Sequence, residues 1–190
     1  VEGAYQRSKD SYANAIRLSP RNPQLYLMLA RMEASANNEQ GARVAVNQAL
    51  VLKQNYTDAI LFVVQLEIAK DNIEGALNAA IAAIQTAPGN AGLWFQAGVL
   101  AFNKEDDTIA RQALEKAIEL SPDYANAKYF LGLVQYRLGN VGESVALFEG
   151  LVATNPGNAE VAEVLAKIKA GKSPIPPKTK TPTTAPVKEN

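Results

Sequence analysis

The residues best suited to chemistry in this sequence are acidic. Three of them stand together as Glu105-Asp106-Asp107, and Glu33 and Glu67 recur 34 residues apart. Grouped carboxylates can bind a metal ion or exchange protons, but both uses need further ligands or a positioned partner group. The sequence supplies carboxylates alone. We therefore predict a structural role for these acids, with no catalytic residue and no metal ligand.

The composition removes several other reaction types. The chain has 190 residues, and none is cysteine or histidine. Without cysteine there are no disulfides, thiolate nucleophiles or structural zinc sites of the usual kind. Without histidine the chain lacks the commonest metal ligand and the side chain that titrates nearest to neutral pH. No glycine-rich phosphate loop or serine nucleophile motif is present either. We predict that the chain is not an enzyme and takes no cofactor.

The charge balance bears on the kind of partner. Nineteen basic and nineteen acidic residues give a formal net charge of zero, so the bulk charge does not indicate nucleic acid as a partner. No apolar run approaches the roughly 18 residues of a membrane span, so we expect no membrane insertion by this segment. No signal peptide opens the sequence. The compartment stays open between the cytoplasm and an envelope location reached through upstream sequence.

Prolines reveal an internal repeat. Pro88, Pro122 and Pro156 are each 34 residues apart, and Pro20 precedes Pro88 by twice that interval. The proline expected between them is replaced by Gln54. A fixed period of this length indicates a repeat architecture. Four units follow from it, and they begin at Pro23, Thr57, Ala91 and Ala125.

The columns of the repeat agree once places are counted from the start of each unit. The eighth place is mostly small, as Ala30, Val64, Gly98 and Gly132. The twentieth place is small as well, as Ala42, Ala76, Ala110 and Ser144. The sixteenth place carries helix-capping types, as Asn38, Asn72, Asp106 and Asn140. Glu143 follows Asn140 in the spacing of a capping box, and Gly139 suits the end of the preceding helix. Each unit is therefore predicted to be two helices joined by a tight turn.

These columns resemble the tetratricopeptide repeat (TPR) family. The third unit matches the family pattern best, through Trp94, Gly98, Ala110, Leu114, Ala117 and Pro122. The first two units depart from it, with Ala30 and Val64 in place of the small glycine. The resemblance implies an all-α fold, a right-handed α-solenoid of antiparallel helix pairs with about four and a half repeats plus a C-terminal capping helix. It also implies that the chain is the TPR region of a larger bacterial protein.

The organisation that follows has seven segments. Residues 1–22 form the second helix of a truncated preceding repeat. The four repeats occupy residues 23–56, 57–90, 91–124 and 125–158. Residues 159–171 form the capping helix, and the Pro/Lys/Thr-rich residues 172–190 are expected to be disordered. The tail contains a PxxP spacing, Pro174-Ile175-Pro176-Pro177, for which a spacer is a simpler role than a ligand for proline-reading modules.

The resemblance further implies a concave groove lined by the first helix of each unit, with the second, fifth, ninth and twelfth places pointing into it. The predicted groove residues are Leu27, Arg31, Leu61, Gln65, Ile68, Phe95, Val99, Phe102, Tyr129, Leu133 and Tyr136. This wall is mostly apolar. Its four aromatic residues either contact a partner or only maintain the superhelix, and the sequence leaves both roles open. The family's cationic clamp for a C-terminal carboxylate is absent, because Arg31 is the only basic residue at the matching places.

We therefore expect a non-catalytic protein–protein interaction scaffold that binds a peptide or protein segment in this groove. The alternative is a structural spacer or a self-assembly domain, forming a homo-oligomer within a larger and membrane-anchored protein.

Overall fold

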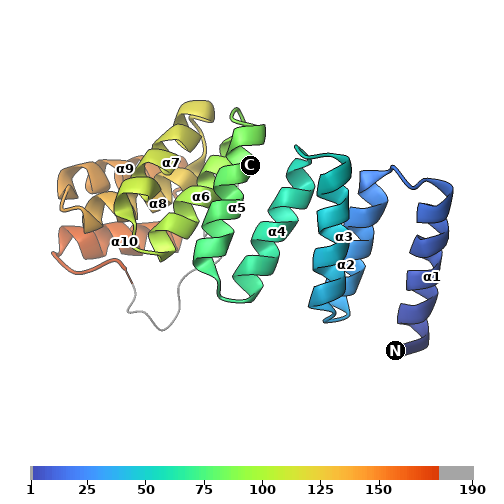
Figure 1. Cartoon of the computed structure of the whole chain (residues 1–190). Coiled ribbons are helices and arrows are strands. Elements are labelled where there is room, and N and C mark those ends of the chain that lie inside the picture. Colours follow the sequence, from blue (N-terminus) through green and yellow to red (C-terminus); the bar gives the residue numbers. More distant parts are fainter. Residues whose placement is uncertain (1, 176–190) are drawn as a thin grey trace. The chain divides into compact units, whose positions relative to one another are not determined.

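The computed structural model describes residues 2–175, and this part of the chain contains helices and no strand. The helices are α1 (Glu2–Leu18), α2 (Pro23–Ser35), α3 (Glu39–Leu52), α4 (Thr57–Ala69), α5 (Ile73–Thr86), α6 (Ala91–Asn103), α7 (Asp107–Leu120), α8 (Ala125–Arg137), α9 (Val141–Thr154) and α10 (Ala159–Lys169). The predicted all-α solenoid of helix pairs is confirmed (Figure 1).

The chain divides into two compact units, residues 1–87 and 88–190. In unit 1, α2 packs against α3 and α4 against α5, while α1 lies beside α2 (Figure 1). In unit 2, α6 pairs with α7 and α8 with α9, and α10 packs against α9. Each pair consists of an earlier helix, called here the first helix, and a later one, the second helix. In this scheme α1 is a second helix and α10 is a first helix.

Three of the predicted helix caps are confirmed. The side-chain Oδ1 atoms of Asn38, Asn72 and Asp106 each accept a hydrogen bond, 3.1 Å long, from the backbone N–H three residues later. Each bond satisfies one of the free N–H groups at the start of a second helix. These residues therefore fix the point at which α3, α5 and α7 begin.

The capping box predicted at Asn140 is wrong. The Asn140 side chain makes no cap hydrogen bond. Its Nδ2 donates instead to Gln135 Oε1 at 3.0 Å, and Glu143 Oε2 accepts from Gln135 Nε2 at 2.5 Å. Gln135, near the end of α8, thus binds the side chains of both residues that the predicted capping box would use. Gly139 has a φ of +84°, the left-handed conformation expected after α8.

Small residues at the eighth place set the distance between the helices of a pair. A Cβ atom added to Gly132 on α8 would lie 2.6 Å from Cε2 of Phe148 on α9. A Cβ added to Gly98 would lie 2.6 Å from Cγ of Leu114. Large side chains on the second helix therefore fill the space that a small residue on the first helix leaves open. The eighth and twenty-fourth places together form the core of each pair.

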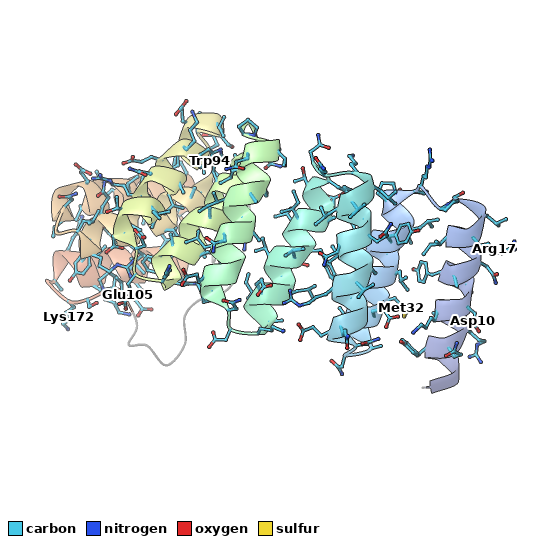
Figure 2. All side chains as sticks on the ribbon, viewed as in Figure 1. Asp10, Arg17, Met32, Trp94, Glu105 and Lys172 are labelled. Atoms are coloured by element: carbon cyan, nitrogen blue, oxygen red, sulfur yellow. The ribbon has the colours of Figure 1, made fainter. Side chains whose placement is uncertain are left out.

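An aromatic donor at the fourth place ties two first helices to the preceding turn. Tyr26 Oη donates to the carbonyl of Pro20 at 3.1 Å. Trp94, labelled in Figure 2, donates from Nε1 to the carbonyl of Pro88 at 2.8 Å. The unit that follows Gln54 has Ile60 at this place, which cannot donate, and the unit that follows Pro122 has Lys128. The aromatic donor is therefore not present after every proline.

After α10 the described chain continues without a helix through residue 175, where Pro174 is buried. Most of the tail predicted to be disordered, residues 176–190, lies outside the described part. Among residues 2–175, no helix is both long and apolar enough to span a bilayer. Within the same residues, no group of three or more acidic, cysteine or histidine side chains is placed to hold a metal ion.

Candidate partner-binding surfaces

The predicted groove residues all lie on first helices. In unit 1 they are Leu27 and Arg31 on α2 and Leu61, Gln65 and Ile68 on α4. In unit 2 they are Phe95, Val99 and Phe102 on α6 and Tyr129, Leu133 and Tyr136 on α8. The exposure of these side chains separates those able to touch a partner from those enclosed in the fold.

In unit 1, four of the five predicted residues are accessible. Arg31 and Gln65 are exposed, and Leu61 and Ile68 are half-buried. Leu27 is only 3% exposed and belongs to the hydrophobic core between α2, α3 and α4. We call the accessible set of Arg31, Leu61, Gln65 and Ile68 the α2–α4 surface. It is apolar on α4 and flanked by polar side chains.

In unit 2, Phe95, Val99 and Tyr136 are half-buried, and we call them the α6–α8 surface. The other three predicted residues are enclosed in the fold, as Phe102, Tyr129 and Leu133, at 3–4% exposure. The four predicted aromatic residues of this unit therefore differ in exposure. Two rings are accessible, and two support the packing of the first helices.

The supporting rings converge on Phe130, which is 1% exposed. Its ring centroid lies 5.6 Å from those of Phe102 and Tyr129 and 5.9 Å from that of Phe95. These pairs are edge-to-face, the arrangement that the ring quadrupoles favour. Phe130 was missed in the sequence because its sixth place was not considered, although Met28 and Phe62 occupy it in unit 1. Phe130 on α8 therefore packs against the neighbouring first helix α6 through Phe95 and Phe102.

Arg137 fixes the position of Phe102. Its Nε donates to Oδ1 and Oδ2 of Asp107 at 2.6 and 2.7 Å, and its Nη2 donates to the Phe102 carbonyl at 3.1 Å. The Arg137 Cζ also lies 4.3 Å from the Phe102 ring centroid, a cation–π contact. The sequence predicted only a structural role for Asp107. The sign that was missed is the pairing of opposite charges in adjacent units.

Tyr129 joins the aromatic cluster to α10. Its hydroxyl donates to Glu160 Oε1 at 3.4 Å, and its ring lies 5.4 Å from that of Phe148 on α9. Burial raises the pKa of Tyr129 strongly, and the negative charge of Glu160 raises it further. The phenol therefore stays protonated and keeps donating at any ordinary pH.

The acids that first suggested chemistry are structural in unit 1. Glu33 is 3% exposed and accepts hydrogen bonds from Tyr5 Oη and Asn38 Nδ2, both at 2.7 Å, with Lys9 Nζ at 3.5 Å. Burial alone would raise the pKa of Glu33. The hydrogen bonds from Tyr5 and Asn38 and the charge of Lys9 lower it overall. Glu33 therefore remains ionised and links α1 to the turn after α2.

Glu67 repeats this arrangement with its own partners. Its Oε1 lies 2.9 Å from Arg43 Nη2 on α3, and its Oε2 accepts from Asn72 Nδ2 at 2.7 Å. The Arg43 hydrogen bond is the main reason that the pKa of Glu67 is lowered. Glu33 and Glu67 therefore have separate partners, because each binds the preceding helix and its own cap. Their carboxylates serve helix stacking.

Comparison with known proteins gives the family. Models described as tetratricopeptide repeats match residues 2–60, 91–124 and 109–168. Over 132 residues the chain is 27% identical to the BBSome complex member BBS4 homolog of Drosophila melanogaster. That match covers 68% of this chain and 27% of the relative, so the chain spans about a quarter of the relative's length.

Solved structures show the same fold. MamA and YrrB, the latter described as a TPR protein with an unusual peptide-binding site, each superpose with a TM-score of 0.72 at 20% identity. The matches cover 82% and 86% of this chain, and 85% and 84% of theirs. A TPR protein from Parabacteroides merdae gives a TM-score of 0.73 at 20% identity, over 89% of this chain and 67% of its own.

Repeat arrays of this kind are in general protein-interaction scaffolds without catalytic activity. The helix pairs, the small-residue columns and the three matching family models agree with one another. The chain belongs to the tetratricopeptide repeat family.

Proposed function

We propose that this chain is a non-catalytic scaffold that binds an extended or helical protein segment on its first helices. Within unit 2 the binding residues are Phe95, Val99 and Tyr136, the α6–α8 surface. Within unit 1 they are those of the α2–α4 surface. The partner is a peptide with apolar side chains, since both surfaces offer apolar or aromatic contacts.

The observation that carries this proposal is the rigid base under the accessible aromatic residues. Phe95 rests on Phe130 and on Tyr124, whose ring centroid is 4.9 Å away. Phe102 is held from the other side by Arg137. Aromatic anchors that are fixed before binding lose little entropy when a partner arrives, and such anchors carry most of the energy in many interfaces. YrrB, which has a similar fold, is itself described as having a peptide-binding site.

A peptide selection tests the proposal. Random peptides displayed on phage would be selected on the intact chain, and their affinities measured by fluorescence anisotropy. We expect Val99→Glu and Tyr136→Ala to weaken the selected peptides at least tenfold, because both changes remove apolar contact on the α6–α8 surface. Val44→Glu on α3 is the matched control, since Val44 is 66% exposed on a second helix. If Val99→Glu and Tyr136→Ala bound the selected peptides as tightly as the unmodified chain does, the proposed surface would be contradicted.

A further inference from the structure

One cation lies next to Tyr136 of the α6–α8 surface, and its guanidinium group is held in a fixed orientation. Arg137 is the last residue of α8. Its Nε donates to both carboxylate oxygens of Asp107, and its Nη2 donates to the carbonyl of Phe102. Asp107 is the first residue of α7, and Phe102 lies near the end of α6, so two other helices hold this side chain. Bonds along one edge of a planar guanidinium fix both its position and the direction of its faces.

One face of this guanidinium lies on an aromatic ring. Arg137 Cζ is 4.3 Å from the centroid of the Phe102 ring. Phe102 is 3% exposed, and its ring makes an edge-to-face contact with Phe130 at the centre of the aromatic cluster. The Arg137 side chain, by contrast, is 23% exposed. The bonded edge and the face on Phe102 are covered, so the opposite face and the Nη1 end are the accessible parts.

The accessible part of Arg137 is close to apolar side chains of the α6–α8 surface. Val99 lies three residues before Phe102 on α6, and residues three apart lie on the same side of a helix. Val99 therefore lies beside the contact between Phe102 and Arg137. Tyr136 precedes Arg137 on α8, and both Val99 and Tyr136 are half-buried. A segment bound across Val99 and Tyr136 would pass close to the open face of the guanidinium.

The local charge decides which partner group suits this face. An exposed arginine can bind a carboxylate or an aromatic ring. Asp107 already neutralises Arg137, and Asp106, which caps α7, adds a second negative charge nearby. A further carboxylate would be repelled by both acids. An aromatic ring carries no net charge, its face attracts the cation, and its carbon atoms can pack on Val99 and Tyr136.

From this arrangement we propose that Arg137 is a specificity-determining residue, and that the partner segment places an aromatic side chain on its open face. The partner ring, the guanidinium and the Phe102 ring would then form a three-layer stack. The inference rests on the proposed function, and it narrows the partner from any apolar segment to one with an aromatic residue. Because Arg137 is held in place before binding, the stack forms with little loss of side-chain entropy.

A double-mutant cycle on the intact chain tests the inference with peptides selected by phage display. We expect tryptophan, tyrosine or phenylalanine at one position of the peptides whose binding is weakened by Tyr136→Ala. Each peptide is compared with a version carrying leucine at that position, by fluorescence anisotropy of the labelled peptides. Leucine should weaken binding to the unmodified chain about fivefold or more. Arg137→Lys keeps the charge but removes the planar face, so the ratio of the two affinities should fall at least threefold.

The ratio of affinities separates a stacking contact from a purely structural role of Arg137. A disturbed fold would weaken both peptides alike and leave the ratio unchanged. Arg17→Lys, at an exposed arginine near the end of α1, is the matched control and should change neither affinity. The inference is overturned by a ratio that Arg137→Lys leaves unchanged, or by selected peptides that carry aspartate or glutamate in place of the aromatic residue.

The proposed function fails on a different result. Val99→Glu and Tyr136→Ala test the surface itself, whereas the affinity ratio tests Arg137. Peptides that depend on Val99 and Tyr136 without a preference for an aromatic residue would refute this inference alone. Peptides that bind independently of Val99 and Tyr136 would refute the proposed function and this inference together.

Discussion

The two units stack the same kind of helix pair with different chemistry. In unit 1, ion pairs join a second helix to the next first helix, through Lys9 to Glu33 and Arg43 to Glu67. In unit 2 an ion pair from Asp107 to Arg137 also joins α7 to α8, but aromatic rings around Phe130 join the first helices in addition. The fold therefore specifies where successive helices must touch, and either charged or aromatic side chains satisfy that requirement.

The residues that form the ion pairs of unit 1 have counterparts in unit 2 that do not pair. The twenty-first place of one repeat and the eleventh of the next are Lys9 and Glu33 in unit 1. In unit 2 they are Arg111 and Gln135. Gln135 is already bonded to Glu143 and Asn140, and Arg111 Nε is buried without an acceptor in the structure. At these two places unit 2 therefore has no ion pair, and the pair that joins α7 to α8 is formed at other places, by Asp107 and Arg137.

The two units can be measured separately because the chain has one tryptophan. Trp94 lies at the start of α6 in unit 2 (Figure 2), so its fluorescence reports the unfolding of that unit. Far-UV circular dichroism reports all the helices.

Removing the central ring should have the largest effect. Phe130→Ala deletes a side chain that is 1% exposed and pairs with three other rings, and we expect a loss of ~3–5 kcal/mol from the free energy of unfolding. Urea titration followed by Trp94 fluorescence measures it. Phe62→Ala at the same place in unit 1 is the matched comparison, and it should lower the Trp94 midpoint far less. A similar Trp94 midpoint in both variants would remove the distinction between the units.

Adding one methyl group at the closest helix approach should come next. Gly132→Ala places a Cβ 2.6 Å from the Phe148 ring, and we expect a loss of ~1–3 kcal/mol from overpacking. Gly150 on α9 has no heavy atom within 4 Å of an added Cβ. Gly150→Ala should therefore stabilise the chain, by up to ~1 kcal/mol, through helix propensity alone. Thermal unfolding of the two variants should shift in opposite directions, and a shift in the same direction would contradict this account of the small-residue column.

A cap exchange tests the charged network of unit 1. Asn38→Asp would replace the amide that donates to Glu33 with a second carboxylate, and we expect a loss of ~1–2 kcal/mol at pH 7. The reciprocal change, Asp106→Asn, should hardly change the free energy of unfolding. Ala101 occupies the eleventh place of this repeat, where Glu33 lies in the first, and its side chain cannot accept a hydrogen bond. Urea midpoints by circular dichroism would measure both. Equal losses of stability in the two variants would show that the hydrogen bond from Asn38 to Glu33 contributes nothing beyond the cap.

The smallest effect should be the pH dependence of unit 1. The Arg43 hydrogen bond lowers the pKa of Glu67 below its ordinary 4.5. A carboxyl group with a lower pKa in the folded state stabilises the protein above its unfolded pKa, and this contribution is lost as the pH falls through the folded value. Glu67→Gln should therefore cost ~0.5–1 kcal/mol at pH 7, a small value because solvent screens the pair. Below pH 4.5 the two stabilities should converge.

Glu119→Gln provides the control for that measurement, because Glu119 forms an exposed pair with Lys116 within α7. The free energy of unfolding of Glu119→Gln should equal that of the unmodified chain at every pH. The opposite outcome is a stability of Glu67→Gln that stays below that of the unmodified chain in strong acid, where Glu67 is protonated. That result would exclude the Arg43 ion pair as the origin of the stability difference.

Much of the fold was predictable because it depends on local periodicity. The positions of Asn38, Asn72 and Asp106 predicted where second helices begin, and small residues at fixed places predicted close helix pairs. The prediction failed at Asn140, although its side chain donates to Gln135 just as Asn38 donates to Glu33, and Asn38 keeps its cap. It also missed Phe130 and Arg137, whose partners lie on other helices of the stack. Which of two nearby polar groups a side chain binds depends on distances between helices, and the spacing of residues along the sequence does not give those distances.

The sequence by itself determined the period, the helix pairs and the family, because each repeat reproduces the same short-range requirements for capping, turning and close approach. Only the tertiary structure decided which apolar residues on the first helices stay accessible. Phe95 and Phe102 lie on one helix of the same repeat, yet Phe102 is enclosed beneath Arg137 and Phe95 is half-buried. Burial is set by neighbours brought from adjacent repeats, and a residue's own place in the period does not specify them.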